Sequence, residues 1–153
     1  GAGDQRDGNL ERAALNAVML TRQFTREHGA TVEVSAEPGL PRIPMNSIEI
    51  EQVFVNLIRN GIESINEGAE IRISIEKTLD GLQCSVSDNG RGMTEDVRLH
   101  AFDPFFTSRL DQSGTGLGLS IVHSIIQSHY GSIEIESTEG AGTTIRFALP
   151  GSP

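Results

Sequence analysis

Basic residues are scarce in this chain. Its 153 residues include 12 Lys and Arg against 21 Asp and Glu, which gives a formal net charge of -9 at pH 7 and a pI near 4.8. Binding to a nucleic-acid backbone or to an anionic membrane surface needs clustered Lys and Arg. The charge balance therefore argues against nucleic acid and against a membrane surface as partners.

Cysteine, long apolar runs and a signal sequence are also lacking. Cys84 is the single cysteine, so the chain cannot form an internal disulfide, and in an alternating strand pattern this residue is best interpreted as a small apolar filler. No apolar run approaches the roughly 20 residues of a membrane helix, and residues 1–4 do not begin a signal sequence. We expect a cytoplasmic location, although the full-length protein could still be anchored in a membrane.

The length and the apolar content of 37% fit one domain with one core. The first residues look like the remnant of an expression tag. We therefore expect residues 1–8 to be a tag or linker remnant, residues 9–153 to be the domain, and the chain to be part of a longer protein.

Hydrophobic periodicity and turn residues predict the order helix, strand, helix, strand, strand, helix, strand, strand. Asn46 and Glu49 resemble a capping box before the second helix, and Asp80-Gly81 is a hairpin signal between two strands. This order is typical of a mixed sheet with helices packed on one face. The predicted helices are residues 9–28, 47–66 and 117–130, and the predicted strands are residues 31–36, 70–77, 82–88, 132–137 and 143–149.

Two segments fall outside these elements. The prolines and glycine of residues 38–41 predict an irregular connection. Residues 89–116 are dotted with glycine and serine and contain only a short helical patch, near residues 95–100. Loops of this length inside a compact domain are usually functional.

Polar side chains follow one face of the second predicted helix, where Gln52, Asn56, Asn60 and Glu63 recur three or four residues apart. Asparagine has a low helix propensity, so two asparagines on one face of a helix are unexpected and need an explanation. Either the amides are simply solvated, which the helix alone favours, or an amide oxygen serves as a hard neutral ligand for Mg²⁺. That ion keeps several waters and takes further oxygens from phosphates.

Asp88 ends a predicted strand and is followed by Gly90 and Gly92. An Asp-Asn-Gly turn is common and needs no further explanation. Alternatively, the glycines let the chain come close to a flat ligand. In that interpretation the Asp88 carboxylate accepts a hydrogen bond from the amino group of adenine, while Met93 packs against the ring.

A glycine run at residues 114–119 opens the third predicted helix. The first amides of a helix are unpaired, so this run is a ready site for an anion such as phosphate. It is not the dinucleotide-binding fingerprint, because no strand precedes it, and no P-loop lysine pattern occurs.

Four segments in fixed order resemble the asparagine, first glycine, phenylalanine and second glycine boxes of the catalytic and ATP-binding domain of sensor histidine kinases, within the GHKL superfamily. The likeness covers about residues 31–150, and the sequences of the motifs most resemble those of kinases of the nitrogen-regulation and oxygen-sensing type. It implies a two-layer α/β sandwich with ATP between the helices and a lid at about residues 94–113. The four segments are NLIRN at residues 56–60, DNGRGM at 88–93, FDPFF at 102–106 and GTGLGL at 114–119.

The same resemblance implies roles for individual residues. Asn60 would bind Mg²⁺, Asn56 would lie by the phosphates, and Thr143 would support the adenine through water. The implied catalytic residues are Asn56, Asn60 and Arg109. The implied nucleotide-binding residues are Asn56, Asn60, Glu63, Asp88, Gly90, Gly92, Met93, Phe105, Gly114, Thr115, Gly116, Leu117, Gly118, Leu119 and Thr143.

Three positions depart from related patterns. Many of these kinases have a lysine where this chain has Arg109, and some have a basic residue where it has Glu63, whose role stays open. ATPases of the superfamily have a water-activating glutamate where this chain has Asn56. An amide cannot take a proton at neutral pH, so we expect slow hydrolysis and a γ-phosphoryl group kept for a protein acceptor.

The phosphoacceptor itself is expected elsewhere. In the family it is a histidine followed by an acidic residue, on a separate dimerisation domain, and it supplies a response regulator downstream. The four histidines of this chain are followed by Gly29, Ala101, Ser124 and Tyr130. A serine kinase of anti-sigma-factor type and a non-catalytic nucleotide-binding module are the two alternatives.

Overall fold

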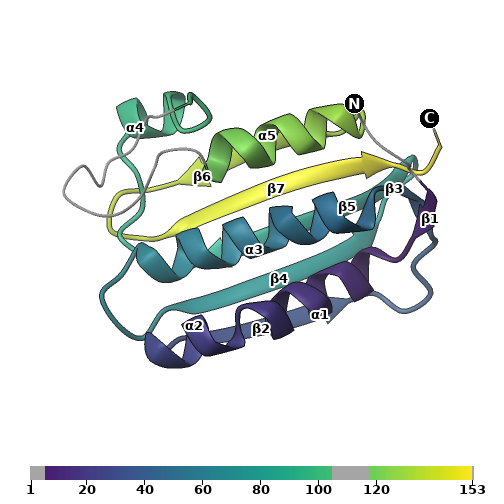
Figure 1. Cartoon of the computed structure of the whole chain (residues 1–153). Coiled ribbons are helices and arrows are strands. Elements are labelled where there is room, and N and C mark those ends of the chain that lie inside the picture. Colours follow the sequence, from purple (N-terminus) through teal and green to yellow (C-terminus); the bar gives the residue numbers. More distant parts are fainter. Residues whose placement is uncertain (1–5, 105–117, 153) are drawn as a thin grey trace.

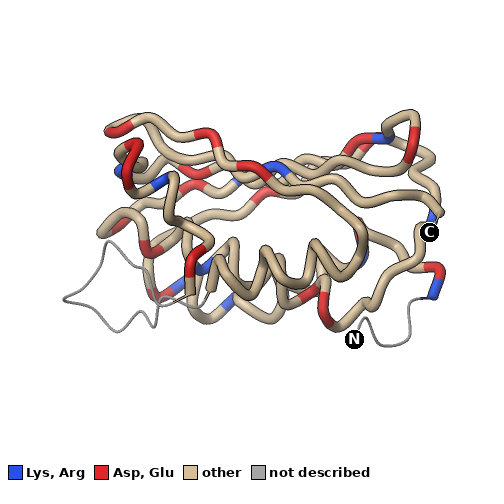
Figure 2. The backbone as a smooth tube through the Cα atoms, turned by 90° about the horizontal axis from the view of Figure 1, so that it is seen from above, with Lys and Arg blue, Asp and Glu red and all other residues tan. Residues whose placement is uncertain are grey.

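The structure, a computed structural model, describes residues 6–104 and 118–152. It has two layers: five strands form one sheet, and helices cover one of its faces (Figure 1). Seen from above, the sheet lies along one side of the molecule and the helices along the other (Figure 2). The predicted two-layer α/β sandwich is therefore confirmed.

The sheet has the strand order β2-β4-β5-β7-β6. β2 pairs with β4 in parallel, and the remaining neighbours are antiparallel, so the sheet is mixed as predicted. The hairpin predicted at Asp80-Gly81 joins β4 to β5. The strands are β2 (Thr31–Ala36), β4 (Glu70–Lys77), β5 (Gly81–Asp88), β6 (Ser132–Ser137) and β7 (Thr143–Pro150).

Two short strands were not predicted. β1 (Arg6–Gly8) and β3 (Ile43–Met45) pair antiparallel in a sheet of their own. Gly8 is buried, and a Cβ atom there would lie 2.4 Å from Cγ of Met45. Three residues carry too little alternation to predict a strand; only the pairing partner reveals it. Residues 6–8 thus contribute a strand, although they fall within residues 1–8. That residues 1–8 are a tag or linker remnant stays a prediction.

The helices are α1 (Leu10–Leu20), α2 (Arg22–Glu27), α3 (Ser47–Glu63), α4 (Glu95–Leu99) and α5 (Gly118–Ser128). The single helix predicted over residues 9–28 is wrong, because Thr21 interrupts it with φ -99° and ψ 6°. The Thr21 hydroxyl donates to the carbonyl of Ala17 at 2.8 Å, and such local bonds from threonine compete with regular helix geometry. Within the described ranges, no helix has the length and hydropathy needed to cross a membrane.

The core lies between α3 and the covered face of the sheet. Alternate residues of β4 point into it, since exposed and buried residues alternate from Glu70 to Glu76. The rings of Phe54 on α3 and Phe147 on β7 have centroids 5.7 Å apart. This packing fixes α3 over the middle of the sheet and carries its C-terminal half to the end of β5.

Candidate functional site

The site is built where four segments meet: the C-terminal half of α3, the end of β5, the start of β7 and the start of α5. Gly61 of α3 lies against the end of β5, since a Cβ atom there would be 3.3 Å from Cβ of Asp88. Gly118 at the start of α5 lies against α3, since its Cβ would be 3.3 Å from Nδ2 of Asn60. Residues from three of the sequence motifs therefore line one region.

The Asp88 carboxylate is held in place through one of its oxygens. Its Oδ1 accepts hydrogen bonds from the backbone N–H of Gly90 at 2.9 Å and of Thr143 at 3.2 Å, and a longer one from the Ser64 hydroxyl at 3.5 Å. Burial raises the pKa of Asp88, and the two backbone bonds lower it. Among the described residues every hydrogen bond to this carboxylate goes to Oδ1, so Oδ2 can accept a bond from a ligand.

Glycines allow the loop after Asp88 to press against its neighbours. A Cβ atom on Gly90 would lie 1.8 Å from the Ser64 hydroxyl oxygen. On Gly92, which has φ +71°, it would lie 2.1 Å from the carbonyl oxygen of Thr138. On Gly142, with φ +89°, it would lie 2.2 Å from the Asp88 carbonyl oxygen. These close approaches exclude side chains and bring β5, β7 and the end of α3 around one small region.

The Thr143 hydroxyl is oriented by a neighbour that the sequence motifs did not include, Ser137 of β6. The Ser137 hydroxyl donates to the carbonyl of Gly142 at 3.1 Å and accepts the backbone N–H of Met93 at 2.8 Å. It therefore accepts from Thr143 at 2.9 Å, which leaves the lone pairs of the Thr143 oxygen for a ligand or water. Ser137 lies directly opposite Thr143 in the register of β6 and β7, which is the signal that could have identified it.

Met93 is half-buried and packs against the hydrophobic core. Its neighbour Arg91 is fixed from both sides, because its N–H donates to the carbonyl of Ser64 at 3.2 Å and its carbonyl accepts the N–H of Gly140 at 2.6 Å. The loop that carries the first glycine motif is thus attached to the end of α3 and to the turn between β6 and β7.

The two asparagines of α3 lie one helical turn apart and are both half-buried. Nδ2 of Asn56 is buried and has no hydrogen-bond partner among residues 6–104 and 118–152. Leaving a buried donor unpaired is unfavourable by about 1–3 kcal/mol, so this amide is suited to meet an acceptor that arrives with a ligand. Glu63 lies in the last turn of the same helix.

These donors fit a magnesium-bound nucleotide. An asparagine oxygen is a suitable ligand for an ion that keeps several waters and binds phosphate oxygens, and Asn60 faces the start of α5 where phosphates would lie. The described residues contain no group of three or more His, Cys, Asp or Glu side chains that could hold a metal ion.

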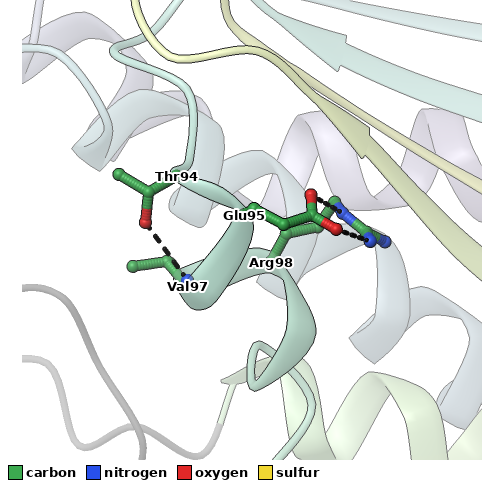
Figure 3. A network of polar contacts seen from close by, with 4 residues as sticks. All are labelled: Thr94, Glu95, Val97 and Arg98. Carbon is green, nitrogen blue, oxygen red and sulfur yellow. Dashed lines mark hydrogen bonds and ion pairs between the residues drawn. The ribbon is translucent and has the colours of Figure 1, made fainter.

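The segment after the first glycine motif begins with α4 (Figure 3). The Thr94 hydroxyl caps this helix by accepting the N–H of Val97 at 3.2 Å, and Arg98 binds both carboxylate oxygens of Glu95, at 3.0 and 2.6 Å. Beyond it, a hydrogen bond to Asp103 at 2.9 Å raises the pKa of His100.

The phenylalanine motif contacts α5 through its first residue. The ring of Phe102 stacks on His123 of α5, with centroids 4.9 Å apart and an interplanar angle of 27°. The third motif is therefore connected to α5, the helix that the fourth motif opens, by an aromatic contact that the spacing of the motifs did not predict.

Comparison with known protein families agrees with this arrangement. Residues 45–153 match the family described as histidine kinase-, DNA gyrase B-, and HSP90-like ATPase. The chain belongs to this family. The matched ATP-binding domain includes α3, β5, β7 and α5, the elements that build the site.

The relatives of this ATPase domain are sensor kinases. The chain is 32% identical over 143 residues to the sensor histidine kinase ZraS of Klebsiella oxytoca, covering 93% of this chain and 30% of ZraS. It is 33% identical over 153 residues to the sensor protein FixL of Bradyrhizobium diazoefficiens, covering 98% of this chain and 30% of FixL. The chain thus spans less than a third of the length of these curated relatives.

Solved histidine kinases share its structure. The nucleotide-free catalytic domain of histidine kinase ThkA superposes with a TM-score of 0.86 at 29% identity, covering 98% of this chain and 97% of that domain. ThkA in complex with the response regulator TrrA superposes with a TM-score of 0.80 at 27% identity, covering 96% of this chain and 42% of that one. The predicted identity as a histidine-kinase ATP-binding domain is confirmed.

Part of the predicted site of this ATPase domain lies outside the described residues. Gly118 and Leu119 are described; they open α5, and Leu119 packs against the core. The residues outside are Phe105, Arg109, Gly114, Thr115, Gly116 and Leu117. The structure brings Asp88, Gly90, Gly92, Met93 and Thr143 together at one end, and Asn56, Asn60 and Gly118 at the other.

Proposed function

We propose that this domain binds Mg-ATP and transfers the γ-phosphoryl group to a histidine on a separate dimerisation and phosphoacceptor domain of the same protein. The phosphoryl group would then pass to a response regulator. The observation that carries the proposal is the placement of the Asp88 carboxylate and the Asn60 amide on either side of the last turns of α3.

The base of the nucleotide would bind at Asp88. Its Oδ1 is occupied by backbone donors, so the free Oδ2 would accept a hydrogen bond from the amino group of adenine. The lone pairs of the Thr143 hydroxyl would hold a water against the ring. A purine with a carbonyl in place of the amino group would bring two acceptors together, so the site should select adenine over guanine.

The phosphates would lie between α3 and the start of α5. Mg²⁺, when bound, would neutralise developing charge on the transferred group. Asn60 would hold the ion through its amide oxygen, and Nδ2 of Asn56 would donate to a phosphate oxygen. The backbone N–H groups at the start of α5 would bind the phosphate tail. Glu63 and Arg109 would act at this end, on the ion and on the terminal phosphate.

The side chain at position 56 supports transfer over hydrolysis. An amide cannot remove a proton from water at neutral pH, so Asn56 cannot serve as a general base. Positioning and charge neutralisation remain as the sources of rate enhancement. The bound ATP would therefore wait for a protein acceptor, and we propose that the domain does this in the cytoplasm, where ATP is supplied.

Two measurements test the proposal. Titration calorimetry should show heat on addition of ATP, with tighter binding when Mg²⁺ is present. After incubation with γ-labelled ATP the chain alone should carry no label, whereas a separately produced acceptor domain added to it should become labelled on histidine. If calorimetry detects no heat on addition of ATP, nucleotide binding is contradicted. Label on this chain, or on serine of a different protein, would contradict the histidine-kinase assignment in favour of a serine kinase.

A further inference from the structure

We propose that His129 is a positioning residue for the nucleotide site. In this inference, which rests on the function proposed above, His129 fixes where α5 lies along α3 and thereby holds Gly118 at the other end of α5 beside Asn60. His129 touches neither nucleotide nor metal. Its contribution is to the geometry of the phosphate end.

Both ring nitrogens of His129 are engaged. The side chain is 2% exposed. Its Nδ1 lies 2.8 Å from the carbonyl oxygen of Ile125, which can only accept, so Nδ1 carries the proton. Its Nε2 accepts the backbone N–H of Asn46 at 3.0 Å. The partners therefore select one neutral tautomer, with a donor directed into α5 and an acceptor directed at α3.

The bond from Asn46 replaces a local one. The Asn46 side chain caps α3 as predicted, since its Oδ1 accepts the N–H of Glu49 at 3.0 Å. In a complete capping box the Glu49 carboxylate would return the bond to the N–H of Asn46. That N–H instead donates to His129, 83 residues away, and Oε1 of Glu49 is buried with no hydrogen-bond partner in the described part of the chain. The predicted capping box is only half formed, because the cross-helix bond takes its second donor.

The two helices are joined at both ends. α5 begins with Gly118 against Asn60 near the end of α3, and His129, directly after α5, meets Asn46, directly before α3, so the helices run antiparallel. Between these ends α5 buries Val122 and Ile126. Apolar contacts are non-directional and resist sliding weakly, whereas a hydrogen bond has a defined length and angle. The His129 bond thus sets the register of the pair.

The end of α5 is shaped to keep His129 at its final position. Tyr130 has φ +61° and is 74% exposed, although left-handed backbone favours glycine. The N–H of Gly131 returns to Ile126 at 2.9 Å and that of Tyr130 to Gln127 at 3.0 Å, which ends the helix at once. α2 ends with the same pair of bonds around Gly29, where the left-handed position is held by glycine.

A pair of substitutions tests the inference. His129→Phe keeps the volume and removes the acceptor for Asn46, and His129→Gln places an amide oxygen near the position of Nε2. We expect His129→Phe to weaken binding of a non-hydrolysable ATP analogue with Mg²⁺ by about tenfold, because small displacements of binding groups are costly. His129→Gln should remain within about threefold of wild type, since it can still accept the bond.

Asn16→Ala is the matched control. Nδ2 of Asn16 on α1 donates to the Glu51 carboxylate on α3 at 2.9 Å, so this variant also removes a polar contact between helices, but not one that involves α5. Its affinity for the analogue should equal that of wild type. Equal affinities for wild type and a folded His129→Phe variant would overturn the positioning role. Absence of binding by wild type would instead overturn the proposed function.

A measurement on the unaltered chain covers the case in which His129→Phe does not fold. Nuclear magnetic resonance should detect a ¹⁵N–¹⁵N coupling across the bond from Asn46 N–H to His129 Nε2, with and without the analogue. We expect the coupling to persist in the complex. Its absence from the wild-type complex would show that the bond does not hold the site together, and would overturn the inference.

Discussion

At the Asp88 end of the site the chain orients its polar side chains with its own hydrogen bonds, whereas at the Asn56 end the described residues leave a buried donor unpaired. Asp88 and Thr143 are each oriented by neighbours, and three glycines close the chain around them. By contrast, Nδ2 of Asn56 is buried and meets no hydrogen-bond partner from the residues that the structure describes, and the Asn60 amide faces the start of α5.

If the domain functions as proposed, the two ends act at different stages. The groups that would bind the base are oriented before a ligand arrives, so binding there would require little ordering of side chains. The phosphate end would be completed only when an anion and a cation supply the missing partners. Affinity should therefore depend most on the first end, and response to Mg²⁺ should depend on the second.

The largest expected effect is the loss of binding in Asp88→Asn. The new Oδ1 can still accept the N–H groups of Gly90 and Thr143, but an NH₂ group in place of Oδ2 meets the amino group of adenine. We expect affinity for ATP to fall about 100-fold or more, as for loss of a charged hydrogen bond, with the fold kept. Calorimetry would measure the affinity for ATP, and circular dichroism would show whether the fold is kept. Unchanged affinity would remove Asp88 from the base pocket.

Asn60→Ala should have a smaller effect that appears only with metal. Binding of ATP with Mg²⁺ should weaken about tenfold, while binding without Mg²⁺ should change little, because the amide oxygen acts on the ion. Gln52→Ala, an exposed position on the same helix, is the control and should behave as wild type. Equal losses with and without Mg²⁺ would indicate that Asn60 contacts the nucleotide itself.

Thr143→Val should weaken ATP binding about threefold to tenfold, because the isosteric side chain removes one hydroxyl from the base pocket. The backbone N–H that holds Asp88 is unaffected, so the effect should be well below that of Asp88→Asn. Ser137→Ala should give a similar or smaller loss, since it frees the Thr143 hydroxyl without deleting it. If Ser137→Ala lost more affinity for ATP than Thr143→Val, Ser137 and not Thr143 would contribute more to binding of the base.

The Asp88 carboxylate should also make the stability of the free domain depend on pH. Burial raises the pKa of Asp88 above the ordinary value of 3.8, so the folded state binds this proton more tightly than the unfolded state. Its contribution to stability is therefore present below that ordinary value and is lost as pH rises through the folded-state pKa. Urea unfolding at a series of pH values should show that the free energy of unfolding of Asp88→Asn rises relative to that of wild type as pH increases. A constant difference would contradict the shift.

The smallest effect on binding is expected for Tyr130→Gly, which should raise the free energy of unfolding by about 1 kcal/mol by relieving left-handed backbone strain. The affinity for ATP should not change, because His129 and its two hydrogen bonds remain. Thermal unfolding with nucleotide titration would measure both. A loss of affinity would mean that the Tyr130 side chain has a role at the site.

The sequence predicted most elements because their apolar residues repeat over many positions. The alternation in β4 and β5 and the stripe of α3 are of this kind, and the motifs at their ends located Asp88, Asn56 and Asn60 correctly on these elements. The break at Thr21 was missed because a hydroxyl bonded to the preceding turn leaves the apolar period unchanged.

The remaining features depend on contacts between distant residues. β1 and β3 are three residues each and are defined only by pairing with one another. The bond between Asn46 and His129 spans 83 residues, and the stacking of Phe102 on His123 joins the phenylalanine motif to α5. No local pattern contains such contacts, so the sequence could name candidate residues for the site but not the contacts that hold them in place.

The burial of Cys84 has a practical use. This residue is the single cysteine of the chain, its side chain is fully buried, and burial raises the pKa of the thiol well above its usual range. Thiol-reactive dyes should therefore leave the native domain unlabelled. A cysteine introduced at exposed Gln127 would then be the one labelled site, and its fluorescence would follow α5 in real time while nucleotide binds and leaves.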